Sequence, residues 1–187
     1  MVSVSEKNFP DNQIWVFDDV ISDKLCKKIR RMLTEDNPDI VNLTYGRGQN
    51  VKCIAIEPPP PKLDKKIQDV VYDIIQKLPK CISIFHDCGY MLRRISGPTL
   101  FHVDGLINDL SDQDRDLTRV STLRKLTLII ALNDDYEGGE FCFPEQNFKI
   151  KLKKGQAIAF PPYWTHPHYT NKLYKNTFRY TINTWLW

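Results

Sequence analysis

The sequence predicts a mainly β protein with flanking helices, an α+β fold in which N-terminal helices pack outside a β-sandwich or barrel. Helical periodicity ends before Cys81, and short β-type runs separated by turn residues follow it. The 187 residues are enough for one substantial core and too few for two ordinary domains. We therefore expect a single domain over residues 1–187.

Two helices are expected in the N-terminal half. After a short apolar strand, Ile14 to Phe17, Ser22 can cap a helix whose apolar face is formed by Leu25, Cys26, Ile29 and Leu33. The proline run at 58–61 cannot continue a strand or a helix, so it separates a β-rich segment from a second helix over Leu63 to Leu78. Apolar residues at helical spacing are typical of helices that pack on a sheet.

Short strands make up the rest of the predicted fold. β-rich sequence flanks a glycine turn between Val41 and Pro58. The polar stretch from Leu106 to Leu123 is expected to be a lid over the site or a plain insertion. The later strands are expected at Tyr90 to Ile95, Leu100 to Val103, Lys125 to Leu132, Gly139 to Phe143, Phe148 to Leu152, Ala157 to Phe160 and Arg179 to Trp187.

Composition excludes several classes of function. The net charge is only +3, and the lysines of FKIKLKKG at 148–155 alternate with apolar residues, which indicates a half-solvated strand and no nucleic-acid groove. Five cysteines without a CxxC pair indicate reduced, mostly buried thiols. No signal peptide and no apolar run of spanning length are evident, so we expect a cytoplasmic protein without a membrane partner. Nothing in the sequence distinguishes a monomer from an oligomer.

The chemistry is concentrated in the stretch TLFHVDG, where His102 and Asp104 sit one residue apart in an apolar run. Alternate side chains of a strand point to the same face, so this pair can converge on one metal ion. A second pair, His166 and His168, follows later in the chain. Two histidines and one carboxylate with open coordination positions are the ligand set of non-haem Fe(II) oxygenases. The sequence therefore predicts an iron site.

The succession of motifs after Tyr90 resembles the Fe(II)/2-oxoglutarate dioxygenases, in particular their prolyl 4-hydroxylase-like branch. The His-x-Asp pair is followed by LNDDYEGGE at 132–140, by GQAIAF at 155–160 and by RYTINTW at 179–185, in the order found in that family. The resemblance implies a double-stranded β-helix core of the jelly-roll or cupin-like type. It also implies Fe(II) as cofactor and 2-oxoglutarate and O₂ as cosubstrates, and it admits ascorbate.

Residue roles follow from the same resemblance. His102, Asp104 and His168 would form the catalytic iron centre. Arg179 would bind the far carboxylate of 2-oxoglutarate through two charge-assisted hydrogen bonds, and Thr181, on the same strand face, could donate its hydroxyl to that carboxylate. We prefer His168 as the distal ligand because relatives place the ligand after such a proline and because its spacing to Arg179 is closer. His166 is the alternative, as the ligand itself or as a partner of it.

Several neighbouring residues have two possible roles. The Gly-Gly pair at 138–139 is expected to form a turn with positive φ. Of Arg93 and Arg94, which precede the iron pair, one can face the substrate pocket, and a solvated or ion-paired arginine is the alternative. Tyr90 and Trp185 can line the pocket or fill the core, and we expect at least one of them in the core.

The resemblance implies an oxygenase that hydroxylates an unactivated C–H bond of a prolyl residue in a peptide or protein, or of a related small molecule. Two other classes of protein could carry the same residues. A catalytically silent double-stranded β-helix that only binds leaves the complete ligand set and Arg179 without a purpose. A zinc hydrolase could use the same three ligands, but no general base is evident near them.

Overall fold

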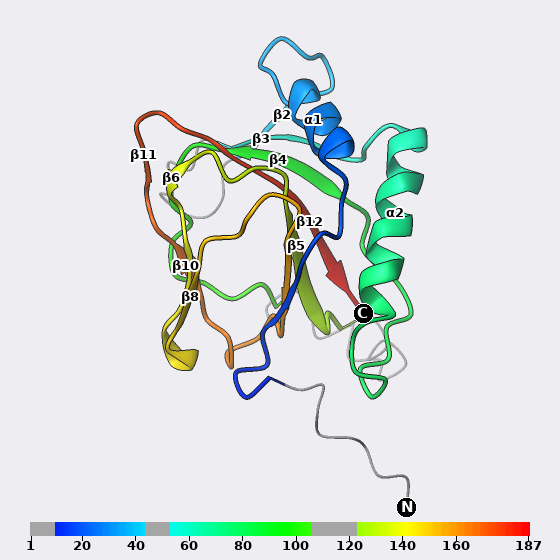
Figure 1. Cartoon of the computed structure of the whole chain (residues 1–187), viewed down its shortest axis with the longest axis vertical. Coiled ribbons are helices and arrows are strands. Elements are labelled where there is room, and N and C mark those ends of the chain that lie inside the picture. The colour runs from blue at the N-terminus through cyan, green and yellow to red at the C-terminus, as the bar shows by residue number, and fades with distance from the viewer. Residues whose placement is uncertain (1–9, 44–52, 106–122) are drawn as a thin grey trace, which may run out of the picture.

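The computed structural model of the chain describes residues 10–43, 53–105 and 123–187. Its largest element, the major sheet, has the antiparallel strand order β1 (Trp15–Phe17), β9 (Ala157–Phe160), β5 (Leu126–Ala131), β12 (Arg179–Leu186), β4 (Met91–Ile95), β3 (Cys53–Ile56) and β2 (Val41–Leu43). The minor sheet has the order β10 (Tyr169–Thr170), β7 (Phe141–Phe143) and β8 (Phe148–Ile150), and β11 (Leu173–Tyr174) pairs with β6 (Glu137–Gly138). Figure 1 shows the short strands at the left of the major sheet.

Two helices, α1 (Asp23–Met32) and α2 (Pro61–Ile75), lie on one face of the major sheet (Figure 1). Alternation along β5 explains why this face is apolar. Leu126, Leu128 and Ile130 pack in one cluster with the buried helix residues, whereas Ile129 and Ala131 pack in a second cluster with the minor sheet. The result is the predicted mainly β fold with helices outside a double-stranded β-helix core.

The helix ends follow local sequence signals. Ser22 caps α1 as predicted, because its Oγ accepts a hydrogen bond from the Leu25 N–H at 3.3 Å. The second helix begins at Pro61, two residues before the predicted start, and it ends at Ile75, three residues before the predicted end. Proline is tolerated in the first turn, where its missing N–H would have had no partner inside the helix.

The predicted strand from Leu100 to Val103 is wrong. This segment makes one isolated antiparallel bridge, between His102 and His168. The flanking residues also pair outside a regular ladder: the Thr99 N–H donates to the Thr170 hydroxyl at 2.8 Å, and the Gly105 N–H donates to the Pro162 carbonyl at 2.8 Å. The segment is therefore fixed by side chains and loops, and a single bridge suffices to place the two histidines together.

The other strands lie close to their predicted positions, but β7 begins at Phe141 and not at Gly139. The Gly138–Gly139 pair forms the expected turn with φ values of 71° and 70°. A Cβ at Gly138 would lie 2.1 Å from the Lys172 carbonyl oxygen, so only glycine fits there. β6, β10 and β11 were not predicted, because elements of two residues carry no periodicity. The predicted loop of 106–123 lies outside the described residues, apart from Leu123.

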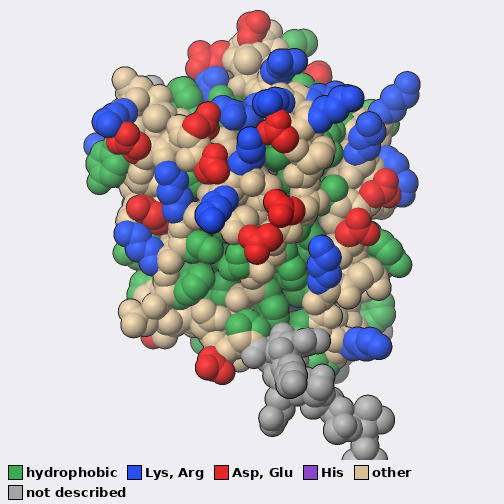
Figure 2. Space-filling model, viewed as in Figure 1, with side chains coloured by type: hydrophobic (Ala, Val, Ile, Leu, Met, Phe, Trp, Pro, Cys, Tyr) green, Lys and Arg blue, Asp and Glu red, His purple; other side chains and the backbone are tan. Residues whose placement is uncertain are grey.

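The basic segment at 148–155 is half-solvated, as its alternation predicts: Lys149 is exposed and Leu152 is buried. Several of the surface lysines have acidic partners, such as Glu140 with Lys149 at 3.9 Å and Asp23 with Lys154 at 2.5 Å. In Figure 2, basic and acidic side chains are intermingled over the upper part of one face. The charge pattern of this face is therefore mixed in sign.

The cysteines agree with the expectation of free, mostly buried thiols. All five cysteines are free, and Cys26, Cys53 and Cys142 are buried. Burial raises the pKa of the Cys26 thiol to about 11, so this thiol is protonated at neutral pH. Neither α1 nor α2, the helices of the described ranges, combines the length and hydrophobicity needed to cross a bilayer.

Candidate metal centre and cavity

The candidate site lies in a cavity of about 390 Å³ on the face of the major sheet that is turned away from the helices. Strands far apart in the sequence form its walls, because β4, β5 and β12 lie side by side in the major sheet. The apolar part of the wall includes Ile129 and Phe141. The lining residues on which the site depends are His102, Asp104, His168, Thr170, Arg179 and Thr181.

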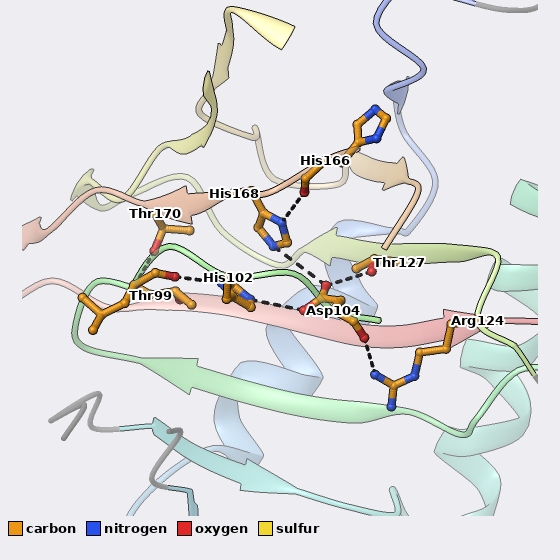
Figure 3. A network of polar contacts seen from close by, with 9 residues as sticks. Thr99, His102, Asp104, Arg124, Thr127, His166, His168 and Thr170 are labelled. Atoms are coloured by element: carbon orange, nitrogen blue, oxygen red, sulfur yellow. Dashed lines mark hydrogen bonds and ion pairs between the residues drawn. The ribbon is translucent and has the colours of Figure 1, made fainter. Parts of the chain in front are cut away.

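Three side chains converge at one place in this cavity. The ligand atoms of His102, Asp104 and His168 all lie within 4.8 Å of one another. The His102 Nε2 is 3.2 Å from one Asp104 carboxylate oxygen, and the His168 Nε2 is 3.8 Å from the other (Figure 3). The isolated bridge between His102 and His168 holds this arrangement, because the backbone N–H of each residue donates to the backbone carbonyl of the other, at 3.0 and 2.9 Å.

Both histidines are held in the tautomer that a metal requires. The His102 Nδ1 lies 2.7 Å from the Leu100 carbonyl oxygen, and the His168 Nδ1 lies 3.1 Å from the His166 carbonyl oxygen. A carbonyl oxygen only accepts, so Nδ1 carries the proton in each ring. The Nε2 lone pairs therefore remain available on the side of Asp104.

Asp104 is fixed from two directions. Its carboxylate accepts a hydrogen bond from the Thr127 hydroxyl at 2.8 Å, and its backbone carbonyl accepts one from Arg124 Nη1 at 2.7 Å (Figure 3). Burial opposes ionisation of this carboxyl, but the adjacent His102, His168 and Thr127 outweigh it and hold the pKa at about 2. The carboxylate is therefore ionised at neutral pH.

The two histidines respond differently to this carboxylate. Burial lowers the pKa of His168 and outweighs the attraction of Asp104. Burial acts in the same direction on His102, but the hydrogen bond and charge of Asp104 raise its pKa overall. Two imidazoles and one carboxylate, held by backbone and hydroxyl partners, fit a divalent cation of the Fe(II) type with open coordination positions.

His166 does not join this cluster. Figure 3 shows its ring turned away from Asp104. Its Nε2 donates to the Asn12 carbonyl at 2.9 Å, and its Nδ1 accepts from the Thr165 hydroxyl at 2.9 Å. Both ring nitrogens are therefore occupied, and the residue contacts the centre only through its carbonyl oxygen, which orients His168. The two histidines are not aligned on one strand face, because β9 of the major sheet ends at Phe160 and β10 of the minor sheet begins only at Tyr169.

Arg179 is buried on the same cavity wall, with 2% of its surface exposed. Its Nη1 donates to the Gly139 carbonyl at 2.6 Å, and its guanidinium carbon lies 4.7 Å from the Phe141 ring centre. Its buried Nε has no hydrogen-bond partner among the described residues. Burial, and next the charge of Arg93, lower its pKa to about 10, so the group is still a cation at neutral pH. An unpaired buried donor on a cation fits a carboxylate ligand.

Thr181 lies two residues after Arg179 and also lines the cavity. In the structure its hydroxyl donates to the Asn183 side-chain oxygen at 2.6 Å. That bond would have to be shared or exchanged for the hydroxyl to reach a carboxylate. The role of Thr181 as a carboxylate donor, expected from its place on the same strand face as Arg179, stays a prediction.

The structure assigns the two arginines and the two aromatic residues for which the sequence left a choice between the cavity and another environment. Arg93 lines the cavity, whereas Arg94 forms an ion pair with Glu35 at 2.7 Å. Tyr90 is buried in the core, and Trp185 lines the cavity. The expectation that at least one of these two aromatic residues is in the core is confirmed.

Sequence reasoning missed the supporting residues Thr127, Thr170 and Arg124. A usable signal existed for Thr127, because it is a polar residue in the otherwise apolar run LTLIIA of a buried strand. No local signal marks Thr170, whose hydroxyl accepts from the Thr99 N–H and also lies 3.4 Å from Arg179 Nη2. Its role depends on the pairing of segments far apart in the chain.

Fold and site together define an Fe(II)-dependent oxygenase of the double-stranded β-helix class. The family model of the 2OG-Fe(II) oxygenase superfamily matches residues 93–187, slightly more than half of the chain. The chain belongs to this superfamily, and it is a 2-oxoglutarate-dependent dioxygenase with Fe(II) as cofactor and 2-oxoglutarate as cosubstrate. A comparison with curated proteins found no match.

Solved structures similar to this chain include prolyl hydroxylases. A viral collagen prolyl hydroxylase from Paramecium Bursaria Chlorella virus-1, in a 2-oxoglutarate complex, matches with TM-score 0.66 and 23% identity, covering 93% of this chain and 94% of that one. A Trichoplax adhaerens prolyl hydroxylase, in complex with a hypoxia inducible factor peptide, matches with TM-score 0.68, 15% identity and coverages of 95% and 84%. A Pseudomonas putida prolyl-4-hydroxylase matches with TM-score 0.59 and 14% identity, covering 93% of this chain and 91% of that one. At these identities the likeness shows the shared fold.

Proposed function

We propose that residues 1–187 form one dioxygenase domain that hydroxylates a prolyl residue of a peptide or protein, or a related small molecule. The observation that carries this proposal is the convergence of His102, Asp104 and His168 in the cavity that also holds the buried Arg179. The prolyl hydroxylases among its structural neighbours support the substrate class.

We assign the metal to His102, Asp104 and His168, and the far carboxylate of 2-oxoglutarate to Arg179 with help from Thr181. When bound, Fe(II) would activate O₂, which is the oxidant, and 2-oxoglutarate would supply two of the electrons that reduce it, so that a C–H bond, O₂ and 2-oxoglutarate give an alcohol, succinate and CO₂. The protein then has three tasks, which are to position the reactants, to exclude water and to select the substrate.

The described residues suit these tasks. The carbonyls of Leu100 and His166 fix the two imidazole rings, and Thr127 fixes the carboxylate of Asp104. These bonds hold the ligand atoms before any substrate arrives. Phe141 and Ile129 supply apolar walls that limit access of water. No side-chain acid or base is required for the reaction, which agrees with the Nδ1 protons being engaged by backbone carbonyls.

The proposal is tested by anaerobic reconstitution with Fe(II) and 2-oxoglutarate, followed by O₂ and a set of prolyl peptides. We expect succinate release that depends on O₂, slow without a peptide and faster with a substrate that gains one oxygen atom in mass. The matched control is Asp104→Ala, which should release no succinate. A silent binding module would release none in the native protein, and a zinc hydrolase would be indifferent to O₂.

A further inference from the structure

Two chain segments lie side by side at the cavity, residues 97–105 and residues 161–170, and we call them together the rim. The isolated bridge between His102 and His168 joins them (Figure 3). The His102 side chain is 33% exposed although it belongs to the metal centre, and Val103, which also lines the cavity, is 37% exposed. A residue that is exposed and also belongs to the cavity wall lies at the opening, so the rim borders the mouth of the cavity.

The rim differs from the rest of the chain in its charge. Charged residues make up 26% of the chain, but the rim contains no lysine, arginine or glutamate, and its single aspartate is Asp104 of the metal centre. Of the ten exposed large apolar side chains in the described ranges, four belong to the rim, namely Leu100, Phe101, Val103 and Trp164. A surface that is depleted of charge and enriched in aromatic residues is typical of the core of a binding interface.

Trp164 is the most exposed of these four side chains, at 72%, and the loop that carries it is fixed on both sides. The Thr165 carbonyl accepts a hydrogen bond from Gln146 Nε2 at 2.6 Å, and the Pro162 carbonyl accepts one from the Gly105 N–H at 2.8 Å. Because these bonds hold the loop before a partner arrives, little conformational entropy is lost when the indole is covered. Such a rigid aromatic side chain is well suited to anchor a partner.

The position of the rim decides what can cover it. A second copy of the chain or a membrane that covered the rim permanently would also close the cavity, because Val103 belongs to both surfaces. A small molecule held at the metal centre would leave Phe101 and Trp164 in water. A polypeptide extends by about 3.3 Å per residue, so it can occupy the cavity with one residue and the rim with a neighbouring one.

We propose that the rim binds a large apolar side chain, aromatic or aliphatic, of a polypeptide substrate, close to the residue that enters the cavity. The inference rests on the proposed function and deepens it, because it selects a polypeptide over a small molecule. Removal of the substrate side chain and of Phe101 and Trp164 from water supplies the affinity. A charged substrate side chain finds no opposite charge on the rim.

The test uses the peptide acetyl-Ala-Ala-Ala-Pro-Ala-Ala-Ala-amide as a host. Each alanine in turn is replaced by phenylalanine or, as a charged comparison, by glutamate, and N-acetyl-L-prolinamide represents a small substrate. Binding is measured by isothermal titration calorimetry on the native protein loaded with Fe(II) and 2-oxoglutarate. Anaerobic conditions prevent turnover during the titration.

Phenylalanine at one or two neighbouring positions should tighten binding about tenfold relative to the host peptide, and glutamate at the same positions should not. N-acetyl-L-prolinamide should bind more weakly than the host. Trp164→Ala should remove the gain from phenylalanine. Tyr72→Ala is the matched control, because Tyr72 is a similarly exposed aromatic residue, at 61%, on α2 across the major sheet from the cavity, and it should keep the gain.

Three binding results would overturn the proposal: no gain from phenylalanine at any position, an equal gain at every position, or a gain that survives Trp164→Ala. The other occupants of the rim are tested with the native protein and the same variant. A dimer seen by analytical ultracentrifugation, or binding to vesicles of phosphatidylcholine and phosphatidylserine, would also overturn the proposal if Trp164→Ala abolished it. The comparison of peptides on the native protein decides the matter even if the variant does not fold.

Failure of the proposed function is recognised separately. After O₂ is admitted, tandem mass spectrometry shows whether the proline of the tightest-binding peptides has gained an oxygen atom. A preference for apolar peptides without oxygen gained on any of their prolines would contradict the proposed function and leave the rim as a peptide-binding surface. Hydroxylation of proline without such a preference would leave the proposed function standing and overturn the role of the rim.

Discussion

The two faces of the major sheet have the same backbone and opposite chemistry. On β12, Ile182 and Leu186 point into the apolar cluster beneath the helices, whereas Arg179, Thr181 and Asn183 point into the cavity. The alternation of a strand produces this separation, because neighbouring residues face opposite sides. Burial of the helix-covered face therefore stabilises the fold, whereas burial of the polar groups on the cavity face costs free energy.

The cost on the cavity face is limited by mutual hydrogen bonds. Thr127 is paired with Asp104, Thr181 with Asn183, and Arg179 with the Gly139 carbonyl. Because each buried polar group that lacks a partner costs about 1–3 kcal/mol, this network keeps the face stable without making it apolar. We expect substitutions on the two faces to have separable effects on activity and on stability.

The largest expected effect concerns the metal. His168→Ala removes one of the three proposed ligands, so Fe(II) binding and succinate release should be abolished. His166→Ala, the matched control, should keep measurable Fe(II) binding, because the carbonyl that orients His168 is part of the backbone and is retained. Iron content after desalting and calorimetric titration with Fe(II) measure both variants. If His166→Ala alone lost the metal, the assignment of His168 would be wrong.

On the helix-covered face, the expected loss is of stability. Ile182 pairs with Ile130 and Leu92 on the neighbouring strands, and all three are almost fully buried. Ile182→Ala should lower the free energy of unfolding by about 2–5 kcal/mol, because it leaves a cavity in the apolar cluster. Urea denaturation measures this change. At a temperature where the variant is folded, its KM for 2-oxoglutarate should be unchanged, and a large increase in KM would contradict the separation of the two faces.

Arg179→Lys tests the cavity face with a smaller change. A lysine keeps the positive charge but cannot form two parallel hydrogen bonds with a carboxylate, so we expect the KM for 2-oxoglutarate to rise about tenfold. Initial rates of succinate release over a range of 2-oxoglutarate concentrations give this value. The KM for Fe(II) serves as the internal control and should not change. An unaltered KM for 2-oxoglutarate would show that the carboxylate binds elsewhere.

Sequence alone predicted what is encoded locally. The Ser22 cap, the alternation in β5 and the His-x-Asp pair can all be read within a few residues of each other. The choice between His166 and His168 could not be settled in this way, because the chain between β9 and β10 is irregular and turns one ring toward Asn12.

The two adjacent arginines show the same limit on another strand. A strand must place Arg93 and Arg94 on opposite faces, but which of them meets the cavity depends on the register between β4 and β12. The same is true of Thr170, whose partners Thr99 and Arg179 come from distant segments. Pairing over long distances in the sequence, and not local propensity, completes the site.

The smallest predicted effect is at the edge of the helix-covered face. Ser22→Ala removes the side-chain oxygen that accepts from the Leu25 N–H, which should lower the free energy of unfolding by about 1 kcal/mol. Ser22→Asp is the matched control, since aspartate also caps helices well, and it should keep most of the stability. Both variants should retain the native KM for 2-oxoglutarate, because α1 packs on the face opposite the cavity. If Ser22→Ala changed this KM while leaving urea unfolding unaltered, the helices would be coupled to the site, and the division of labour between the two faces would fail.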